Sequence, residues 1–341
     1  MANLTRAHHE LFRRAPDERL SSLDELWERC QQEKQFSNDY WHLPRALAPQ
    51  PTDGTVKVTL GDDGAFLLND WSFTQLCRIS GINRDTVNRL SPETASRALQ
   101  ETLPAAEKPI QLLTTGRSVR SLHGVTYTRL WNADLLSVVR EFATDFQPPQ
   151  KGTGGATGLY CGEQDMFVFL IDPTGWAEIN GEAFAPGFFL WNSEVGRRSL
   201  GIQSFWFQAV CQNHIVWDAV EVFDFTRKHT ANVHEGLSEI RRIIETLVEK
   251  RDARRDGFVR VLTKARQESL GPDGESVAQE LARNGIPRNL GRDAIEIARQ
   301  QGAFTIFALV DALTRLTQKA KYAGDRVEAD AKVASLLALA V

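Results

Sequence analysis

The spacing of apolar residues changes near Asn232, and this change divides the chain into two stretches of different predicted structure. Before it, several short stretches show the alternation or the unbroken apolar character of β-strands, with helical stretches between them. After it, apolar residues recur every three or four positions, which predicts helices alone. We therefore expect an α+β fold with a β-rich central body, flanking helices and an all-helical C-terminal region.

The individual elements follow from periodicity and from turn residues. An alternating stretch at 55–60, a glycine-bounded turn at 61–64 and a partner at 65–68 predict a hairpin. Asn132 is expected to cap a helix that carries Leu135 and Leu136. Near Trp206 both faces of a strand are apolar, which predicts a strand covered on both sides. The other predicted elements are helices at 17–36, 84–90, 92–102, 275–283, 290–300, 305–320 and from 325, and strands at 166–171, 184–191, 200–211 and 215–225.

Three regions are predicted along the chain. Residues 1–150 form an N-terminal α+β region, residues 151–231 a strand-rich region that completes the core, and residues 232–341 a helical C-terminal region. The first boundary falls in a glycine-rich stretch at 147–158. A phosphate-binding loop would follow a strand and open a helix, whereas these glycines follow a predicted helix and precede a strand. We interpret the stretch as a flexible linker.

Composition narrows the classes of function. The 341 residues carry 40 basic and 44 acidic side chains, and the net charge of −4 argues against coating nucleic acid by bulk charge. The four cysteines lie far apart and show no metal-binding spacing, so we expect reduced thiols, no bound metal and no cofactor. No stretch reaches the roughly 18 apolar residues that span a bilayer. We expect a cytoplasmic protein that does not contact membranes.

Acidic residues are concentrated between residues 160 and 196, where six acids and no Lys or Arg occur. Metal-dependent nucleases use clustered carboxylates to hold magnesium. The candidates for such a cluster are Asp172, Glu182 and Glu194. They lie in different predicted strands and turns, so we interpret them as solvated strand edges.

Basic residues are concentrated further along, where residues 227–267 hold eleven Lys or Arg against six Asp or Glu. Cations beside exposed aromatic rings bind single-stranded nucleic acid, because the cations contact phosphates and the rings stack on bases. The alternative is a solvated helix face beside an aromatic core. The candidate phosphate contacts are Arg117, Arg120, Arg129, Arg197, Arg198, Lys228 and His229, and the candidate stacking residues, where exposed, are Trp131, Trp191 and Trp206.

Several strings of residues resemble the phage/plasmid-like protein family of domain of unknown function 932. The strings are residues 73–82 with Leu90-Ser91-Pro92, residues 119–132, Asn192-Ser193-Glu194-Val195-Gly196, residues 210–217 and Arg227-Lys228-His229-Thr230. The likeness spans roughly residues 20–240, and it departs at residues 123–126, where the family usually has Ser-Asp-Arg. It implies carriage by phages, plasmids and integrated elements, and it brings no established activity.

The residues and the resemblance together predict a non-catalytic protein of a mobile element that binds single-stranded nucleic acid, in strand annealing or recombination, as a homo-oligomer. The alternative is a counter-defence protein that binds and inhibits a host protein complex. A metal-dependent nuclease is the third hypothesis. A positive surface beside residues 192–196 favours the first hypothesis, and converging carboxylates there favour the third.

Overall fold

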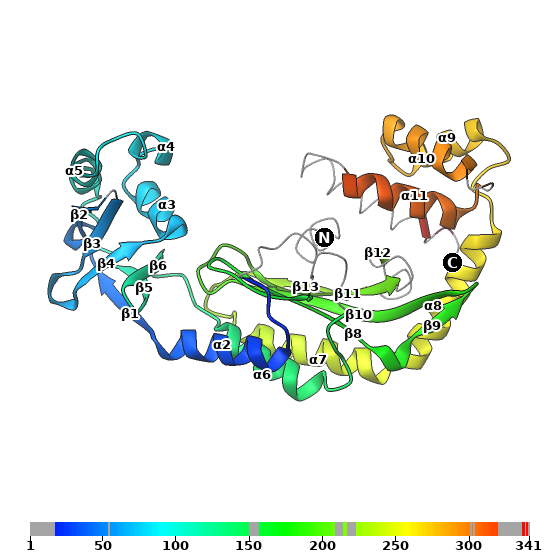
Figure 1. Cartoon of the computed structure of the whole chain (residues 1–341), viewed down its shortest axis with the longest axis horizontal. Coiled ribbons are helices and arrows are strands. Elements are labelled where there is room, and N and C mark those ends of the chain that lie inside the picture. Colours follow the sequence, from blue (N-terminus) through cyan, green and yellow to red (C-terminus); the bar gives the residue numbers. More distant parts are fainter. Residues whose placement is uncertain are drawn as a thin grey trace.

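The structure, a computed structural model, describes residues 18–53, 55–149, 157–208, 214–216, 223–300, 302, 304–319, 336–337 and 339. It is an α+β protein, as predicted. Two sheets lie side by side along the long axis of the molecule, and helices run beneath the larger sheet (Figure 1). The centre of the predicted linker, 150–156, and most of the helix predicted from residue 325 fall outside the described residues.

The N-terminal sheet has the strand order β1-β5-β6-β4-β3-β2, and only the β4–β6 pairing is parallel. The predicted hairpin is confirmed as β3 and β4. Helices α3 (Asp70–Ile79), α4 (Arg84–Val87) and α5 (Pro92–Thr102) share a buried apolar cluster with this sheet. The strands are β1 (Ser37–His42), β2 (Ala48–Thr52), β3 (Thr55–Thr59), β4 (Ala65–Leu68), β5 (Ile110–Thr115) and β6 (Ser118–Gly124).

The central sheet has the order β12-β11-β10-β8-β7, with β13 also paired to β11 and β9 to β10. Every pairing in it is antiparallel, so consecutive long strands form a meander. The strands are β7 (Leu159–Cys161), β8 (Met166–Ile171), β9 (Ala177–Ile179), β10 (Glu182–Asn192), β11 (Leu200–Gln208), β12 (His214–Val216) and β13 (Asp224–Arg227).

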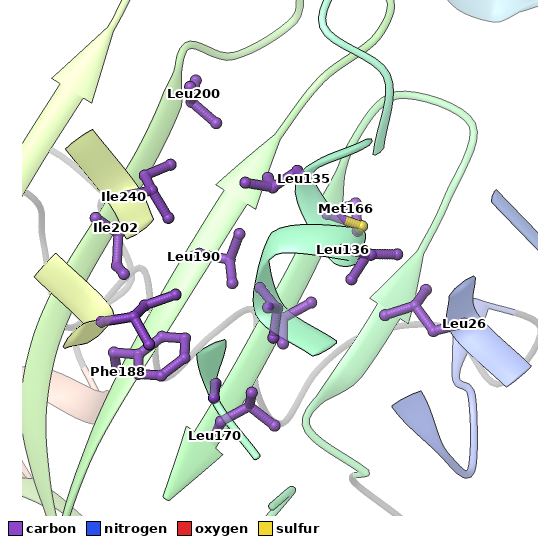
Figure 2. Packing of buried hydrophobic residues seen from close by; sticks show 14 of the residues in the cluster. Leu26, Leu135, Leu136, Met166, Leu170, Phe188, Leu190, Leu200, Ile202 and Ile240 are labelled. Carbon is purple, nitrogen blue, oxygen red and sulfur yellow. The ribbon is translucent and has the colours of Figure 1, made fainter. Parts of the chain in front are cut away.

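Helices cover both faces of the central sheet. One face packs on α2 (Leu23–Gln35), α6 (Asn132–Phe142) and α7 (Glu235–Glu249), as Figure 2 shows. The other packs on α9 (Gly274–Arg283), α10 (Arg288–Gln300) and α11 (Ile306–Lys319). Helix α8 (Arg251–Gln267) contacts both faces: its Phe258 packs on Trp206 of the first face, and its Ala265 joins the cluster of the second. In β10, Leu190 lies in the first cluster and Phe189 in the second. In β11, the neighbours Phe205 and Trp206 are both fully buried, which confirms the predicted strand with two covered faces.

Glycines permit the closest approaches inside the central sheet. Gly201 in β11 lies directly opposite Trp191 in β10. A Cβ atom on Gly201 would lie 2.1 Å from the Trp191 ring, so the indole fits only because this residue has no side chain. Trp191 therefore packs down onto the neighbouring strand and is buried.

The start of α6 differs from what the sequence predicts. The expectation that Asn132 caps α6 is wrong: the capping position is Trp131, which makes no side-chain cap, and Asn132 is the first helical residue.

Among the described cysteines, Cys30, Cys77 and Cys161 are buried free thiols, as expected. Within the described residues, no helix combines the length and the apolar character needed to cross a bilayer.

Candidate functional site

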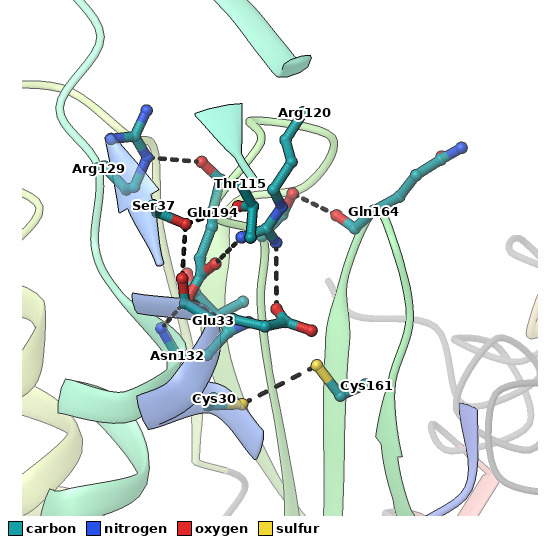
Figure 3. Close-up of polar contacts among 12 residues, drawn as sticks. Cys30, Glu33, Ser37, Thr115, Arg120, Arg129, Asn132, Cys161, Gln164 and Glu194 are labelled. Atoms are coloured by element: carbon teal, nitrogen blue, oxygen red, sulfur yellow. Dashed lines mark hydrogen bonds and ion pairs between the residues drawn. The ribbon is translucent and has the colours of Figure 1, made fainter. Parts of the chain in front are cut away.

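The junction loop, residues 192–198, connects β10 to β11 and contacts the N-terminal sheet. It contains the Asn-Ser-Glu-Val-Gly string and lies where α2, β6 and the start of α6 meet (Figure 3). Asn192 is fully buried, and its side-chain amide donates to the Leu130 carbonyl and to Asn132 Oδ1, both at 2.9 Å. The loop is therefore anchored to the start of α6 before it turns.

Glu194 is the centre of this loop, and its side chain is 2% exposed. One carboxylate oxygen accepts from the Asn132 N–H at 2.8 Å, so Glu194 supplies the cap that α6 lacks locally. The other accepts from Arg120 at 2.9 Å. Burial raises the pKa of Glu194, and Arg120 opposes that rise. The carboxylate and the guanidinium stabilise each other as a buried ion pair.

Arg120 reaches Glu194 because β6 is irregular at this residue. In the pairing of β5 with β6, Leu113 lies opposite Ser121 and Thr114 opposite Val119, so Arg120 is the extra residue of a β-bulge. A bulge redirects the side chain of the inserted residue. The Arg120 guanidinium also lies 3.4 Å from the Glu33 carboxylate of α2. The Arg120 guanidinium thus lies between two carboxylates (Figure 3).

Arg129 makes the second ionic contact of the junction. Its Nη1 atom lies 2.7 and 2.6 Å from the two carboxylate oxygens of Asp39 in β1, and its Nε donates to the Glu194 carbonyl at 3.2 Å. The guanidinium lies 5.0 Å from the Trp131 ring. These contacts join β1, the junction loop and the start of α6, and they bury Arg129.

Three rings are stacked beside the loop. His123 lies on Tyr127 with ring centroids 3.6 Å apart, and Tyr127 lies 5.5 Å from His229. The Tyr127 hydroxyl donates to the Glu194 carbonyl at 2.8 Å. Gly196 has a φ of +71°, and a Cβ there would lie 2.6 Å from His123. Glycine therefore permits both the backbone turn and the close approach of the stack.

The two histidines of the stack are held neutral. Burial lowers the pKa of His123 to about 3, assisted by the charge of Arg129. Burial also lowers the pKa of His229 to about 4, against a hydrogen bond from its Nδ1 to the Thr128 carbonyl. Within the described residues, the buried Nε2 atoms of both rings and Nη2 of Arg129 have no hydrogen-bond partner. The site thus has hydrogen-bonding capacity that the described part of the chain does not use.

These pKa values predict how stability depends on pH. Since the folded values lie below the ordinary 6.5, the unfolded chain takes up protons first as the pH falls. The free energy of unfolding is expected to be highest above pH 6.5 and to fall between pH 6.5 and 4. Urea denaturation across this range measures it. In His229→Asn, which retains a donor for the Thr128 carbonyl, the dependence should be weaker; an unchanged dependence would contradict the burial of a neutral His229.

The exposed edge of the junction carries two cations. Arg197 and Lys228 are both exposed, and among the described residues no carboxylate lies within ion-pair distance of either. The Arg197 guanidinium lies 5.3 Å from the Trp71 ring, whose indole N–H donates to the Val195 carbonyl at 2.8 Å. Lys228 directly precedes His229 of the ring stack. Arg197 therefore borders a ring that is held in place by a hydrogen bond.

The structure places the predicted contact residues in three environments. Arg120, Arg129 and His229 are buried at the junction, whereas Arg198 is half-buried and bonded to Asp165. Arg117, Arg197 and Lys228 are exposed, and Arg117 lies at the other end of β6 from the ring stack. Trp131 is half-buried. Trp191 and Trp206 are buried in the core and present no ring face to solvent.

The acidic candidates do not converge. Asp172 bonds Arg251, Glu182 bonds Arg266 and Glu194 bonds Arg120, so each carboxylate has an arginine partner of its own. The interpretation as solvated strand edges is wrong for Asp172 and Glu194, which are buried because these ion pairs enclose them. In the part of the chain that the structure describes, no three His, Cys, Asp or Glu side chains gather as metal ligands.

Many cations of the basic segment 227–267 are paired with carboxylates, some of which lie outside the segment: Arg251 pairs with Asp172 and Arg266 with Glu182. On α7 and α8, arginines pair with acids three or four residues away, as in Arg241–Glu245 and Arg242–Glu239. Arg254 is buried against Phe223. The excess of positive charge in the sequence is therefore less available to a partner than the count suggests.

Several residues of the site carry no local signal in the sequence. Trp71, at the start of α3, meets Val195 across 124 residues of chain, and Asp39 meets Arg129 across 90. Tyr127 and His123 lie within the string at 119–132, at its departure from the family pattern. The folded structure, and not the sequence, shows that these residues lie together around the junction loop.

Comparisons with known proteins assign the chain to no family: no protein-family model, no curated protein and no solved structure matches it. The resemblance to the phage/plasmid-like family stays a prediction.

Proposed function

We propose that the protein binds single-stranded nucleic acid, without catalysis, along the exposed edge of the junction loop. The observation that carries the proposal is the pair of exposed cations, Arg197 and Lys228, which have no carboxylate partner in the described part of the chain, and of which Arg197 lies over the Trp71 ring. Other cations of the junction, such as Arg120 and Arg129, are used in ion pairs. Phosphates would contact the two free cations.

The rings beside these cations suit a single strand. Bases that are not paired stack on aromatic rings and on the planes of guanidinium groups. Arg197 lies over Trp71, and the hydrogen bond from the indole to Val195 fixes that ring. Because the ion pairs of the junction hold this edge rigid, binding would cost little conformational entropy.

The double variant Arg197→Ala/Lys228→Ala tests the proposal. Each neutralised phosphate of a single strand contributes about 0.7 to the slope of log affinity against log salt, so the variant should flatten the slope by about 1.4. Fluorescence anisotropy with a labelled single-stranded oligonucleotide at several salt concentrations measures it. The matched control, Arg241→Ala/Arg242→Ala, also removes two exposed cations, each of which is paired with a glutamate, and should leave the slope unchanged. Equal slopes in wild type and both variants would refute the proposal.

A protein-binding role is the second candidate, and exposed apolar residues near β1 favour it. Phe36 is 67% exposed and Trp41 49%, and β1 is an edge strand of the N-terminal sheet. Exposed rings on an unpaired strand edge are typical of a surface that binds another protein. A counter-defence protein acting there would retain its biological effect in Arg197→Ala/Lys228→Ala and lose it in Phe36→Ala/Trp41→Ala.

A further inference from the structure

Helices α9 and α10 form a compact pair that is joined by a four-residue turn, Asn284-Gly285-Ile286-Pro287. Gly285 has a φ of +76°, which favours glycine. The Ile286 N–H donates to the Leu281 carbonyl at 2.9 Å, and the Ile286 side chain is buried. Pro287 then precedes the first turn of α10. A short turn with glycine, followed by a buried apolar residue, is typical of helix-turn-helix units.

Helices α9 and α10 pack against each other through buried side chains. Buried residues of α9 and α10 meet in one cluster, together with residues of α11. Gly291 in α10 is buried, and a Cβ there would lie in ordinary contact with Leu281 Cδ1, at 3.5 Å, so the two helices pack closely at this position. The buried residues of the pair are Val277, Leu281, Ile286, Gly291, Ala294, Ile295 and Ala298.

The outward face of α10 carries a row of arginines. Arg288, Arg292 and Arg299 are exposed. At about 100° per residue they fall within an arc of about 40°, along one edge of the exposed face. Arg299 pairs with Glu296 at 3.3 Å, whereas Arg288 and Arg292 have no carboxylate within ion-pair distance among the described residues. Asp293 lies about 100° further around the helix than Arg292, and Glu296 borders the row beside Arg299. Among the described residues, the N-terminal arginines, Arg288 and Arg292, are therefore the two of the row that keep their charge unpaired.

We propose that α9 and α10 form a helix-turn-helix unit that binds duplex DNA, with the first turns of α10 in the major groove. In such units the N-terminal residues of the second helix reach base edges. Arg288 and Arg292 supply the guanidinium groups that bond guanine, and Asn289, also exposed, supplies the amide that bonds adenine. The positive row complements the phosphates that border the groove.

This surface is separate from the junction. The α9–α11 unit lies at the end of the molecule opposite the N-terminal sheet (Figure 1). α11 packs against both α10 and α8, so the exposed face of α10 is turned away from these neighbours. The protein could therefore hold a duplex at one end while the junction edge holds a single strand, and either activity could be lost without the other.

The test compares Arg288→Ala/Arg292→Ala with wild type on a short random-sequence DNA duplex and on a single strand of the same length. We expect about a tenfold loss of duplex affinity, with single-strand affinity unchanged. Arg241→Ala/Arg242→Ala is the charge-matched control and should bind the duplex like wild type. Arg197→Ala/Lys228→Ala should also retain duplex binding, which separates this proposal from that of the junction.

Three outcomes would overturn the proposal. The first is a wild-type protein that does not bind the duplex at low salt. The second is duplex affinity in Arg288→Ala/Arg292→Ala equal to that of the control, which would leave the arginine row for another kind of partner. The third is an equal loss on duplex and single strand, which would show a general charge effect.

Discussion

Replacing Arg120 with alanine is expected to lower the free energy of unfolding by about 3–5 kcal/mol, the usual cost of removing one partner from a buried ion pair. The substitution leaves Glu194, 2% exposed, without its cation and leaves Glu33 without its nearest one. Burial then favours the protonated form of Glu194, which weakens the cap on α6. Urea denaturation followed by circular dichroism measures the change.

Arg117→Ala is the matched control for this prediction, because Arg117 is an exposed arginine just before the same strand. Its effect should be within about 0.5 kcal/mol of zero. In Glu194→Gln the amide oxygen can still accept from the Asn132 N–H, so the loss should be smaller than in Arg120→Ala. If Arg120→Ala were as stable as Arg117→Ala, the junction would not be a buried ionic core.

Replacing Trp206 with alanine is the second change with a large expected effect, about 3–5 kcal/mol of stability. Trp206 is fully buried, and its ring is stacked on Phe258 of α8 with centroids 4.0 Å apart. Removing the indole would leave a cavity between the central sheet and α8. Trp176→Ala, at a residue 51% exposed, is the control and should cost little.

The Trp206 variant also separates two roles for that residue. A base-stacking tryptophan would cost binding and leave the fold intact, whereas a core tryptophan costs stability. We expect Trp206→Ala to unfold at a lower urea concentration and Trp206→Phe to recover much of the loss. A stable Trp206→Ala protein with weakened affinity for single strands would contradict the core assignment.

The fold was predictable where a pattern is local. Alternation and turn glycines predict the β3–β4 hairpin, and the double apolar face around Trp206 predicts a strand covered on both sides. The helical region after Asn232 follows from spacing. The cap of α6 was not predictable, because the carboxylate that binds the Asn132 N–H comes from Glu194, 62 residues away.

The site was less predictable for the same reason. Arginines are expected at the surface, but Arg120 is directed inward by a β-bulge that local spacing does not reveal. Glu194 is its partner across 74 residues. By contrast, the neutralisation of α7 is readable from spacing, since Arg241 and Glu245 lie one helical turn apart.

Photocrosslinking of a single strand is the most direct test of where the protein binds nucleic acid. An oligonucleotide that carries iodouracil would be irradiated in complex with the full chain, and the crosslinked peptides identified by mass spectrometry. Aromatic residues that stack on a base are the preferred partners. We expect crosslinks to peptides that contain Trp71, and fewer in Arg197→Ala/Lys228→Ala. Crosslinks confined to peptides away from the junction, or as strong in the variant as in wild type, would contradict it.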